Sequence, residues 1–187
     1  MTYEHAPSPN MKLRPTSTRP QTSGSINLAF DIETNGLDCT EIHCIVTQDL
    51  DTGLVTEYND QASPNYSIVN AVNDLEQATN IISHNGIMYD IPQIKKHFPF
   101  YQGHAKHWDT LILSRFFHPD MLELDLRRKW AMMPARLYGS HSLEAYGYRL
   151  RCFKDGFAKT TDWQEWSQDM QDYCKKDVAI LAKLWTH

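Results

Sequence analysis

The chain has 187 residues and a mass of 21.7 kDa, which fits one domain with an added segment and excludes a two-lobed enzyme. Hydrophobic residues make up 41% and charged residues 22%, so the chain can build a packed core. No window approaches the ~18 consecutive apolar residues of a membrane span, and the start lacks the apolar stretch of a signal peptide. We therefore expect a protein of the cytosol without a membrane segment.

Charge is distributed unevenly along the chain. The net charge is -5, but residues 1–90 carry -9, residues 91–160 carry +6 and residues 161–187 carry -2. Chance scatter over a solvated surface is one explanation of this asymmetry. The other is a carboxylate cluster that binds cations beside a basic surface that binds phosphate groups.

The first 25 residues differ in composition from the rest. Four prolines stand there among Ser, Thr and Gln, and such a segment buries too little apolar area to offset the entropy lost on ordering. We expect a flexible arm over residues 1–25 and one folded domain over residues 26–187.

Alternating and turn-rich segments predict a mixed sheet. Residues 26–33 alternate between an apolar face and a face with two acids, as a strand does. Residues 42–47 and 54–58 flank a turn-rich link and predict a hairpin, which gives three antiparallel strands. Helical spacing over residues 68–75 and a short buried strand at residues 81–84 predict a crossover to a parallel strand. The fold class is therefore mixed α/β.

Helix signals dominate the second half. Pro92 suits the first turn of one helix, and Asp109 can cap the next. Residues 118–140 are basic and irregular, and a short helix over residues 142–150 follows.

The last helix carries a phenol and a carboxylate on one face. Thr161 and Gln164 resemble a capping box that opens it, and a 3.6-residue apolar period continues to the chain end. Tyr173 and Asp177 are four residues apart and share a helical face. A charge on an otherwise apolar face is costly unless it is paired or bound to metal, so Asp177 is a candidate site residue.

Two further acidic motifs precede this helix. Asp31 and Glu33 lie two apart on the first strand and project from one face, and residues 34–36 form a turn through which a ligand could approach the backbone. The segment from Asn85 to Asp90 follows a buried strand and opens a helix. Asp90 by itself indicates a helix cap, and a cap can also be a ligand.

Four carboxylates in one pocket would require cations. Each one raises the pKa of the others, so they cannot all stay ionised alone. Two divalent cations balance four negative charges, and oxygen-only ligands select Mg²⁺ or Mn²⁺ over zinc. Two such ions ~3.5 to 4 Å apart can hold the attacking and leaving oxygens of a phosphoryl displacement. The four cysteines are too irregularly spaced for a zinc site, and we expect them to remain thiols.

The order of the motifs resembles a known family. D-x-E, N-x-x-x-[FY]-D and Y-x-x-x-D in sequence are the pattern of the DEDDy 3′-5′ exonucleases, which implies a ribonuclease H-like mixed sheet flanked by helices. Residues 108–115 (WDTLILSR) and 139–150 (GSHSLEAYGYRL) are similar to the proofreading domain of podophage family A DNA polymerases. The match covers about residues 26–185. The arm has no counterpart there, and those polymerases continue beyond residue 187, so either a free-standing exonuclease or an excised piece is implied.

The resemblance implies a role for each catalytic residue. Asp31 would bridge two metal ions, and Glu33 and Asp177 would complete the site of the ion that activates water. Asp90 would help to hold the ion at the leaving oxygen. Tyr173 would orient the water, because a phenol with a pKa near ~10 is poorly matched for taking its proton at neutral pH.

Four residues are implied in substrate binding. Asn85 would donate to a phosphate or sugar near the terminal nucleotide, and Tyr89 of the same motif is assigned with it. The backbone amides of Thr34 and Asn35 are candidates for binding the 3′-hydroxyl end.

We expect a metal-dependent 3′-5′ exodeoxyribonuclease that acts on single-stranded or frayed DNA 3′ ends and releases nucleoside 5′-monophosphates. The expected partner is a DNA polymerase on a separate chain, and the protein is expected to be a cytoplasmic monomer, in the host cytoplasm if a phage encodes it. Two alternatives stay open. One is a 3′-5′ exoribonuclease, because no residue identifies a pocket for the 2′-hydroxyl, and the other is a catalytically silent polymerase-binding module.

Overall fold

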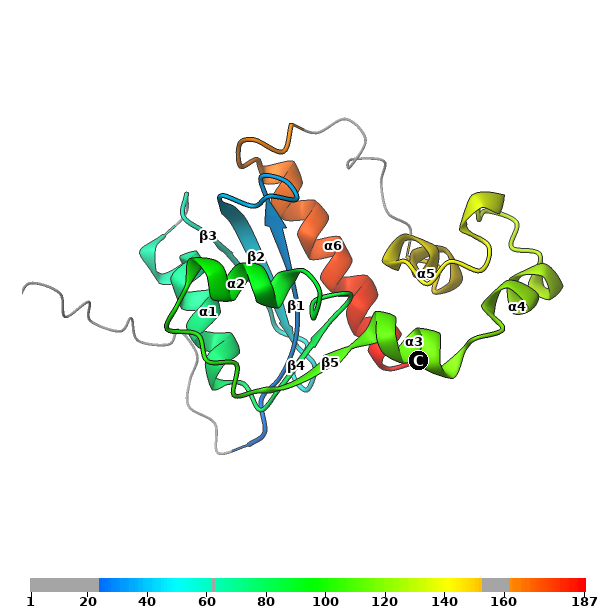
Figure 1. Cartoon of the computed structure of the whole chain (residues 1–187), viewed down its shortest axis with the longest axis horizontal. Coiled ribbons are helices and arrows are strands. Elements are labelled where there is room, and N and C mark those ends of the chain that lie inside the picture. The colour runs from blue at the N-terminus through cyan, green and yellow to red at the C-terminus, as the bar shows by residue number, and fades with distance from the viewer. Residues whose placement is uncertain (1–23, 62, 153–161) are drawn as a thin grey trace, which may run out of the picture.

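Five strands form one mixed sheet in the order β3-β2-β1-β4-β5 (Figure 1). The computed structural model describes residues 24–61, 63–152 and 162–187. β2 is antiparallel to β1 and to β3, whereas β4 runs parallel to β1 and β5 parallel to β4. Three antiparallel strands plus parallel ones are therefore confirmed. The strands are β1 Asn27–Thr34, β2 Ile42–Asp49, β3 Val55–Asn59, β4 Asn80–Ser83 and β5 Lys106–Asp109.

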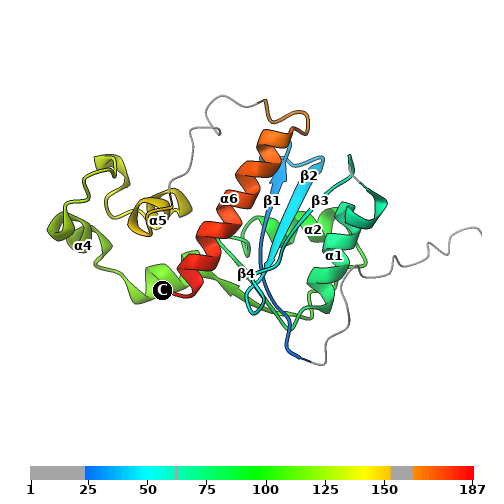
Figure 2. The same ribbon diagram turned by 180° about the vertical axis from the view of Figure 1, so that it is seen from behind.

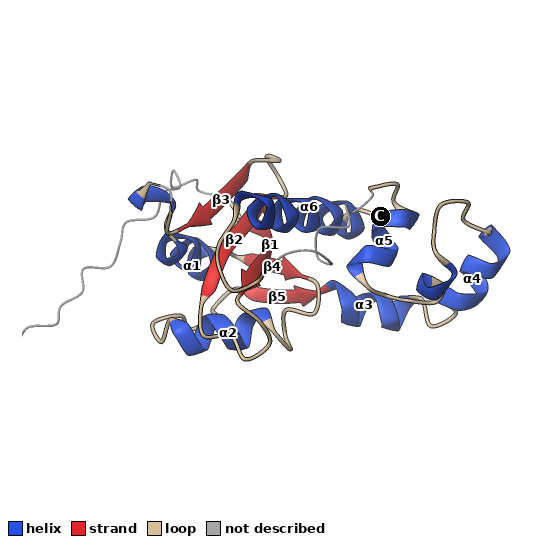
Figure 3. Cartoon of the chain, turned by 90° about the horizontal axis from the view of Figure 1, so that it is seen from above, coloured by secondary structure: helices blue, strands red, loops and turns tan. Residues whose placement is uncertain are grey.

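Helices cover both faces of the sheet. One apolar cluster joins the Leu28, Phe30 and Ile32 side of β1 to α1 and α2, and a second joins the opposite side to α6. Figure 3 shows the sheet between α2 and α6, and Figure 2 shows α6 lying along the sheet from behind. The helices are α1 Ile68–Gln77, α2 Asp90–His97, α3 Thr110–Phe117, α4 Met121–Arg128, α5 Leu143–Arg149 and α6 Gln168–Trp185, with short 3-10 turns at Pro64–Tyr66 and Ala135–Leu137.

The helices α3, α4 and α5 form a helical extension beyond β5, on the side away from α1 (Figure 1). Asp109 caps α3 as expected, since its carboxylate accepts hydrogen bonds from the Leu111 and Ile112 amides. Ser142 caps α5 in the same manner through the Ala145 amide. None of the described helices is long and apolar enough to cross a membrane.

Two expectations about the elements were incomplete. β5 was not predicted, because its four residues KHWD show no clear alternation. Residues 118–140 are not irregular throughout but contain α4, whose sequence MLELDLRR alternates like a strand. The buried residues of α4 are Met121 and Asp125. Because one of them is an acid, the helix lacks the apolar 3.6-residue period by which a helix is predicted.

The predicted start of the last helix was wrong. α6 begins at Gln168, and the hydroxyl of Ser167 caps it by accepting from the Met170 amide at 3.2 Å. Gln164 lies in the turn before the helix, while Thr161 and residues 1–23 of the expected arm fall outside the described residues.

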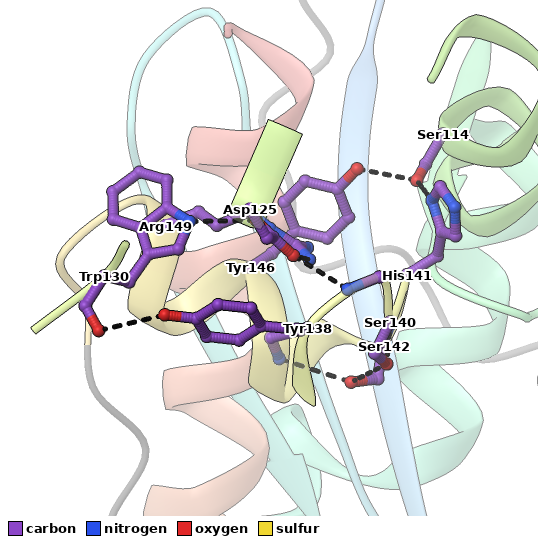
Figure 4. A network of polar contacts seen from close by, with 11 residues as sticks. Ser114, Asp125, Trp130, Tyr138, Ser140, His141, Ser142, Tyr146 and Arg149 are labelled. Atoms are coloured by element: carbon purple, nitrogen blue, oxygen red, sulfur yellow. Dashed lines mark hydrogen bonds and ion pairs between the residues drawn. The ribbon is translucent and has the colours of Figure 1, made fainter. Parts of the chain in front are cut away.

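A buried ion pair holds the helical extension together (Figure 4). Asp125 is 1% exposed and accepts two hydrogen bonds from Arg149, at 3.0 and 2.7 Å. The same carboxylate accepts from the indole of Trp130 and from the Gly139 amide, both at 2.8 Å. Burial alone would raise the pKa of Asp125, but these hydrogen bonds and the charge of Arg149 outweigh burial and lower that pKa.

We predict that Asp125→Ala lowers the free energy of unfolding by about 3 to 5 kcal/mol, because it leaves the Arg149 guanidinium buried without its counter-charge. Urea unfolding followed by circular dichroism measures the loss. The exposed pair of Arg136 and Glu144 provides the control, since Glu144→Ala should cost less than ~1 kcal/mol. Equal losses for the two variants would contradict the structural role of the buried pair.

Candidate functional site

Two carboxylates and a thiol form a compact group where β1 meets α6. Asp31 and Glu33 are half-buried on the face of β1 that α6 covers, and Cys174 of α6 is fully buried. The Sγ atom of Cys174 donates to the Asp31 carbonyl at 3.4 Å and to Asp31 Oδ2 at 3.7 Å. One donor atom from each of the three residues lies within 4.8 Å of the others, a spacing that can hold a metal ion.

Cys174 is a site neighbour that the sequence did not reveal. Its position in the 3.6-residue apolar period of α6 marks a core residue, and nothing in the spacing distinguishes it from its apolar neighbours. Burial raises the pKa of the Cys174 thiol well above its ordinary value, and Cys44, Asp31 and Glu33 raise it further. The group therefore consists of two oxygen ligands beside a neutral thiol at neutral pH.

α6 brings the third motif to the same region. Asp177 is buried at 7% exposure, as expected for the acid in its apolar face, and Tyr173 lies one turn earlier on the same helix. The Tyr173 ring lies edge-on to Trp163, with centroids 6.2 Å apart. Asp177 lies outside the compact group of Asp31, Glu33 and Cys174.

Asp90 is buried next to the backbone of β1. It is 5% exposed, and the amide of Ile32, between the two acids of β1, donates to its carboxylate. Burial raises the pKa of Asp90 to about 7. Hydrogen bonds from its own amide and from the Ile32 amide lower this pKa only in part, and the charge of Asp109 raises it further. Like Asp177, Asp90 lies outside the compact group.

The helix-cap interpretation of Asp90 is wrong. The N-cap of α2 is Tyr89, which makes no side-chain cap hydrogen bond, and Asp90 is the first helical residue. Its carboxylate accepts from its own amide and from the Ile32 amide of β1. A buried acid that is not used as a cap retains the capacity to bind a cation.

The loop that carries Asn85 is fixed by Asp109. Oxygens of that carboxylate accept from the amides of Asn85 and Ile87, at 3.0 and 3.1 Å. Asn85 adopts a left-handed φ of 69°, and a Cβ on Gly86 would lie 2.0 Å from Ser83 Oγ. The sequence indicated only the capping role of Asp109, because its contacts to the loop depend on β5, which was not predicted.

The side chain of Asn85 is exposed, whereas Tyr89 is engaged in the protein. The Tyr89 hydroxyl shares a 2.5 Å hydrogen bond with Thr34 Oγ1 and donates to the Gly36 carbonyl at 2.9 Å. These contacts tie the start of α2 to the turn after Glu33. Tyr89 thus positions the loop that follows the two acids of β1.

Asn35 also acts within its loop. Its amide donates to the Glu41 carbonyl at 3.2 Å, and its side-chain oxygen accepts from the amides of Thr40 and Glu41. The Asn35 amide, expected to bind a 3′-hydroxyl, therefore already has a partner. The Asn35 carbonyl accepts from the side-chain amide of Gln164, which links this loop to the segment before α6.

Comparisons with known proteins agree with this fold. The profile of the RNase_H superfamily matches residues 28–187. The DNA-directed DNA polymerases of Escherichia phage T7 and Enterobacteria phage T3 are each 29% identical over 182 and 183 residues, which is 84% of this chain and 26% of each polymerase. The chain thus spans about a quarter of the length of these relatives. The resemblance to phage DNA polymerases is confirmed.

Solved structures share the fold. One described as the apo form of the nuclease superposes with a TM-score of 0.58 at 22% identity, over 88% of this chain and 70% of that one. Brucella melitensis NrnC bound to pGG superposes with a TM-score of 0.55, and NrnC with bound Mg²⁺ superposes with a TM-score of 0.53. Each is 19% identical over 87% of this chain and 71% of NrnC. The profile match over residues 28–187 shows that the chain belongs to the RNase H superfamily, and the solved structures share its mixed sheet with flanking helices.

Proposed function

We propose that this domain is a metal-dependent 3′-5′ exonuclease that hydrolyses the last phosphodiester bond of single-stranded or frayed DNA and releases nucleoside 5′-monophosphates. The observation that carries the proposal is the pairing of Asp31 and Glu33 on β1 beneath the helix that bears Tyr173 and Asp177. The phage DNA polymerases at 29% identity favour DNA as the substrate and proofreading for a replicative polymerase as the role.

The acids of the site fit divalent cations. Asp31 and Glu33 offer oxygens within 4.8 Å of each other, and Asp90 and Asp177 are buried acids, which cations would stabilise in the ionised form. We propose that these four carboxylates hold two ions of the Mg²⁺ or Mn²⁺ type. When bound, such ions supply Lewis acidity and a nucleophile at neutral pH. A solved structure of NrnC is described as containing Mg²⁺, which supports this assignment.

Tyr173 and Asn85 complete the proposed site. We propose that the Tyr173 hydroxyl positions the attacking water, with the Trp163 ring restricting the rotation of the phenol. The exposed Asn85 side chain is available to donate to a phosphate or sugar of the terminal nucleotide. Thr34 and Tyr89 act by holding the turn after Glu33, and Asn35 holds the same loop closed.

A second candidate function is hydrolysis of RNA ends. NrnC, which shares this fold, is described as bound to pGG rather than to a longer DNA strand, so RNA ends are the second substrate to test. The two candidates share the same acids and differ only in how the site treats the 2′-hydroxyl.

We predict that the protein shortens 5′-labelled single-stranded DNA from its 3′ end in single-nucleotide steps and acts more slowly on RNA of the same sequence. Gel electrophoresis of 5′- and 3′-labelled oligonucleotides of both sugars reports polarity and sugar choice together. Faster loss of the RNA would favour the second candidate. Absence of hydrolysis on every substrate would favour a silent polymerase-binding module instead.

We predict that Asp31→Ala, Asp90→Ala and Asp177→Ala each remove nearly all hydrolysis without unfolding the protein, because removing one of several like charges relieves repulsion in the metal-free site. Tyr173→Phe should cost ~10² to 10⁴ in rate, as expected of a group that positions water or handles a proton. Asp172→Ala, an exposed acid of the same helix, is the matched control and should keep full activity. Equal loss for Tyr173→Phe and Asp31→Ala would contradict the role of the tyrosine.

We predict that excess chelator abolishes hydrolysis and that Mg²⁺ or Mn²⁺ raises the Tm of the wild type, since a ligand that binds only the folded state stabilises it. Differential scanning calorimetry measures the shift without reference to activity. Asp31→Asn should lose the shift, and Asp172→Asn should retain it. Hydrolysis that persists in chelator would overturn the metal-dependent mechanism.

A further inference from the structure

A cavity of about 660 Å³ lies apart from the acidic site, between the helical extension and the end of α6. This volume falls within the range of roughly 300 to 1,000 Å³ that is typical of ligand sites. α3, α4, α5 and α6 all contribute to its wall, and none of the residues assigned to catalysis lines it.

Aromatic rings with cations beside them form much of the wall. Trp108 and Trp185 lie 5.8 Å apart between ring centroids, and Lys106 Nζ stands 4.0 Å over the Trp108 ring. The guanidinium of Arg128 lies 5.5 Å from the Trp130 ring. Flat aromatic faces next to cations are the chemistry that binds bases and phosphates of a single strand.

One cation of the wall, Arg128, has no ion-pair partner among the described residues. Among the described residues that line the cavity, Asp125 is the one acid, and Arg149 neutralises it at 2.7 Å. Arg128 therefore adds an uncompensated positive charge, and Arg127 and Lys129 flank it in the chain. Nη1 of Arg149 is buried and has no hydrogen-bond partner among the described residues, so this wall also holds an unused donor.

Two elements connect the cavity to the acidic site. Thr110 lines the cavity, and its hydroxyl donates to the Ser83 carbonyl at 3.0 Å and hydrogen-bonds His84 Nδ1 at 2.9 Å, directly before Asn85. α6 carries Asp177 at the site and Trp185 at the cavity, eight residues and about 12 Å apart along the helix. A strand whose 3′ end occupies the site could therefore reach the cavity with nucleotides further from that end.

We propose that the cavity binds an upstream nucleotide of the substrate strand, with its base against the aromatic wall and its phosphate at Arg128. This inference rests on the proposed exonuclease function, because the acidic site fixes which end of the strand is bound. It identifies the helical extension as the element that retains single-stranded substrates longer than the few nucleotides held at the site.

The test compares two matched pairs of variants in an Asp31→Ala background, which prevents hydrolysis during binding. Phe117 and Arg128 line the cavity, whereas Phe116 and Arg127 are their exposed neighbours outside it. Each is replaced by Ala, and affinity for 5′-fluorescein DNA of about 3 and about 12 nucleotides is measured by fluorescence anisotropy.

Phe117→Ala and Arg128→Ala should each weaken binding of the longer strand by ~5-fold or more and leave binding of the short strand unchanged. Arg128→Ala should also reduce the magnitude of the slope of log affinity against log salt by about 0.7. Phe116→Ala and Arg127→Ala should change neither length. Circular dichroism checks that each variant is folded.

Unchanged affinity of the cavity variants for the longer strand would overturn the inference and favour a protein-docking surface. Equal losses of affinity in Phe116→Ala and Arg127→Ala would also overturn it. The same holds if free deoxynucleoside monophosphate binds the cavity as tightly as the strand does. These outcomes are separable from failure of the proposed function, because hydrolysis of short DNA by the protein with an intact Asp31 tests the acidic site alone.

Discussion

One buried carboxylate, that of Asp109, links the sheet to both functional regions of the molecule. The position of Asp109 is set by the register of the parallel strands, in which Ser83 of β4 pairs with Asp109 at the end of β5. From there its oxygens accept the amides of Asn85 and Ile87 on one side and those of the first turn of α3 on the other. Loop and helix are therefore positioned by a single side chain rather than by separate contacts. Because four backbone amides converge on this one side chain, the arrangement leaves little freedom to the loop or to the helix.

The buried acids of this protein divide into two kinds according to what offsets their burial. Asp125 receives a guanidinium, an indole and a backbone amide, and its pKa falls below the ordinary value. Asp90 receives only backbone amides as stabilising partners, and its pKa rises to about 7. A fully compensated acid contributes to stability, whereas an incompletely compensated one keeps an affinity for cations. Burial alone does not distinguish them, but the partners do.

The sequence predicted most of the sheet and both covering faces, because β1, β2 and α1 have clear periods of two or 3.6 residues. It did not predict β5, which is too short for a period, or α4, whose buried face is partly a carboxylate. At the candidate site, the motifs on β1 and α6 come together in the structure, since Cys174 next to Tyr173 contacts Asp31, while the catalytic roles of the acids stay predictions. The position of Cys174 beside Asp31 and the hydrogen bonds of Asn35 depend on contacts between distant segments, and no local pattern encodes them.

α6 has a consequence for how this chain can tolerate change in length. The helix runs for 18 residues and presents Cys174 to one partner, β1, and Leu184 and Trp185 to another, the helical extension. One residue inserted between Asp177 and Trp185 would turn everything after it by ~100° about the axis and advance it by ~1.5 Å. The turn between β2 and β3 could absorb such an insertion, because its backbone is exposed. Variation in length should therefore be confined to the loops, and α6 should keep a constant number of residues between its two ends.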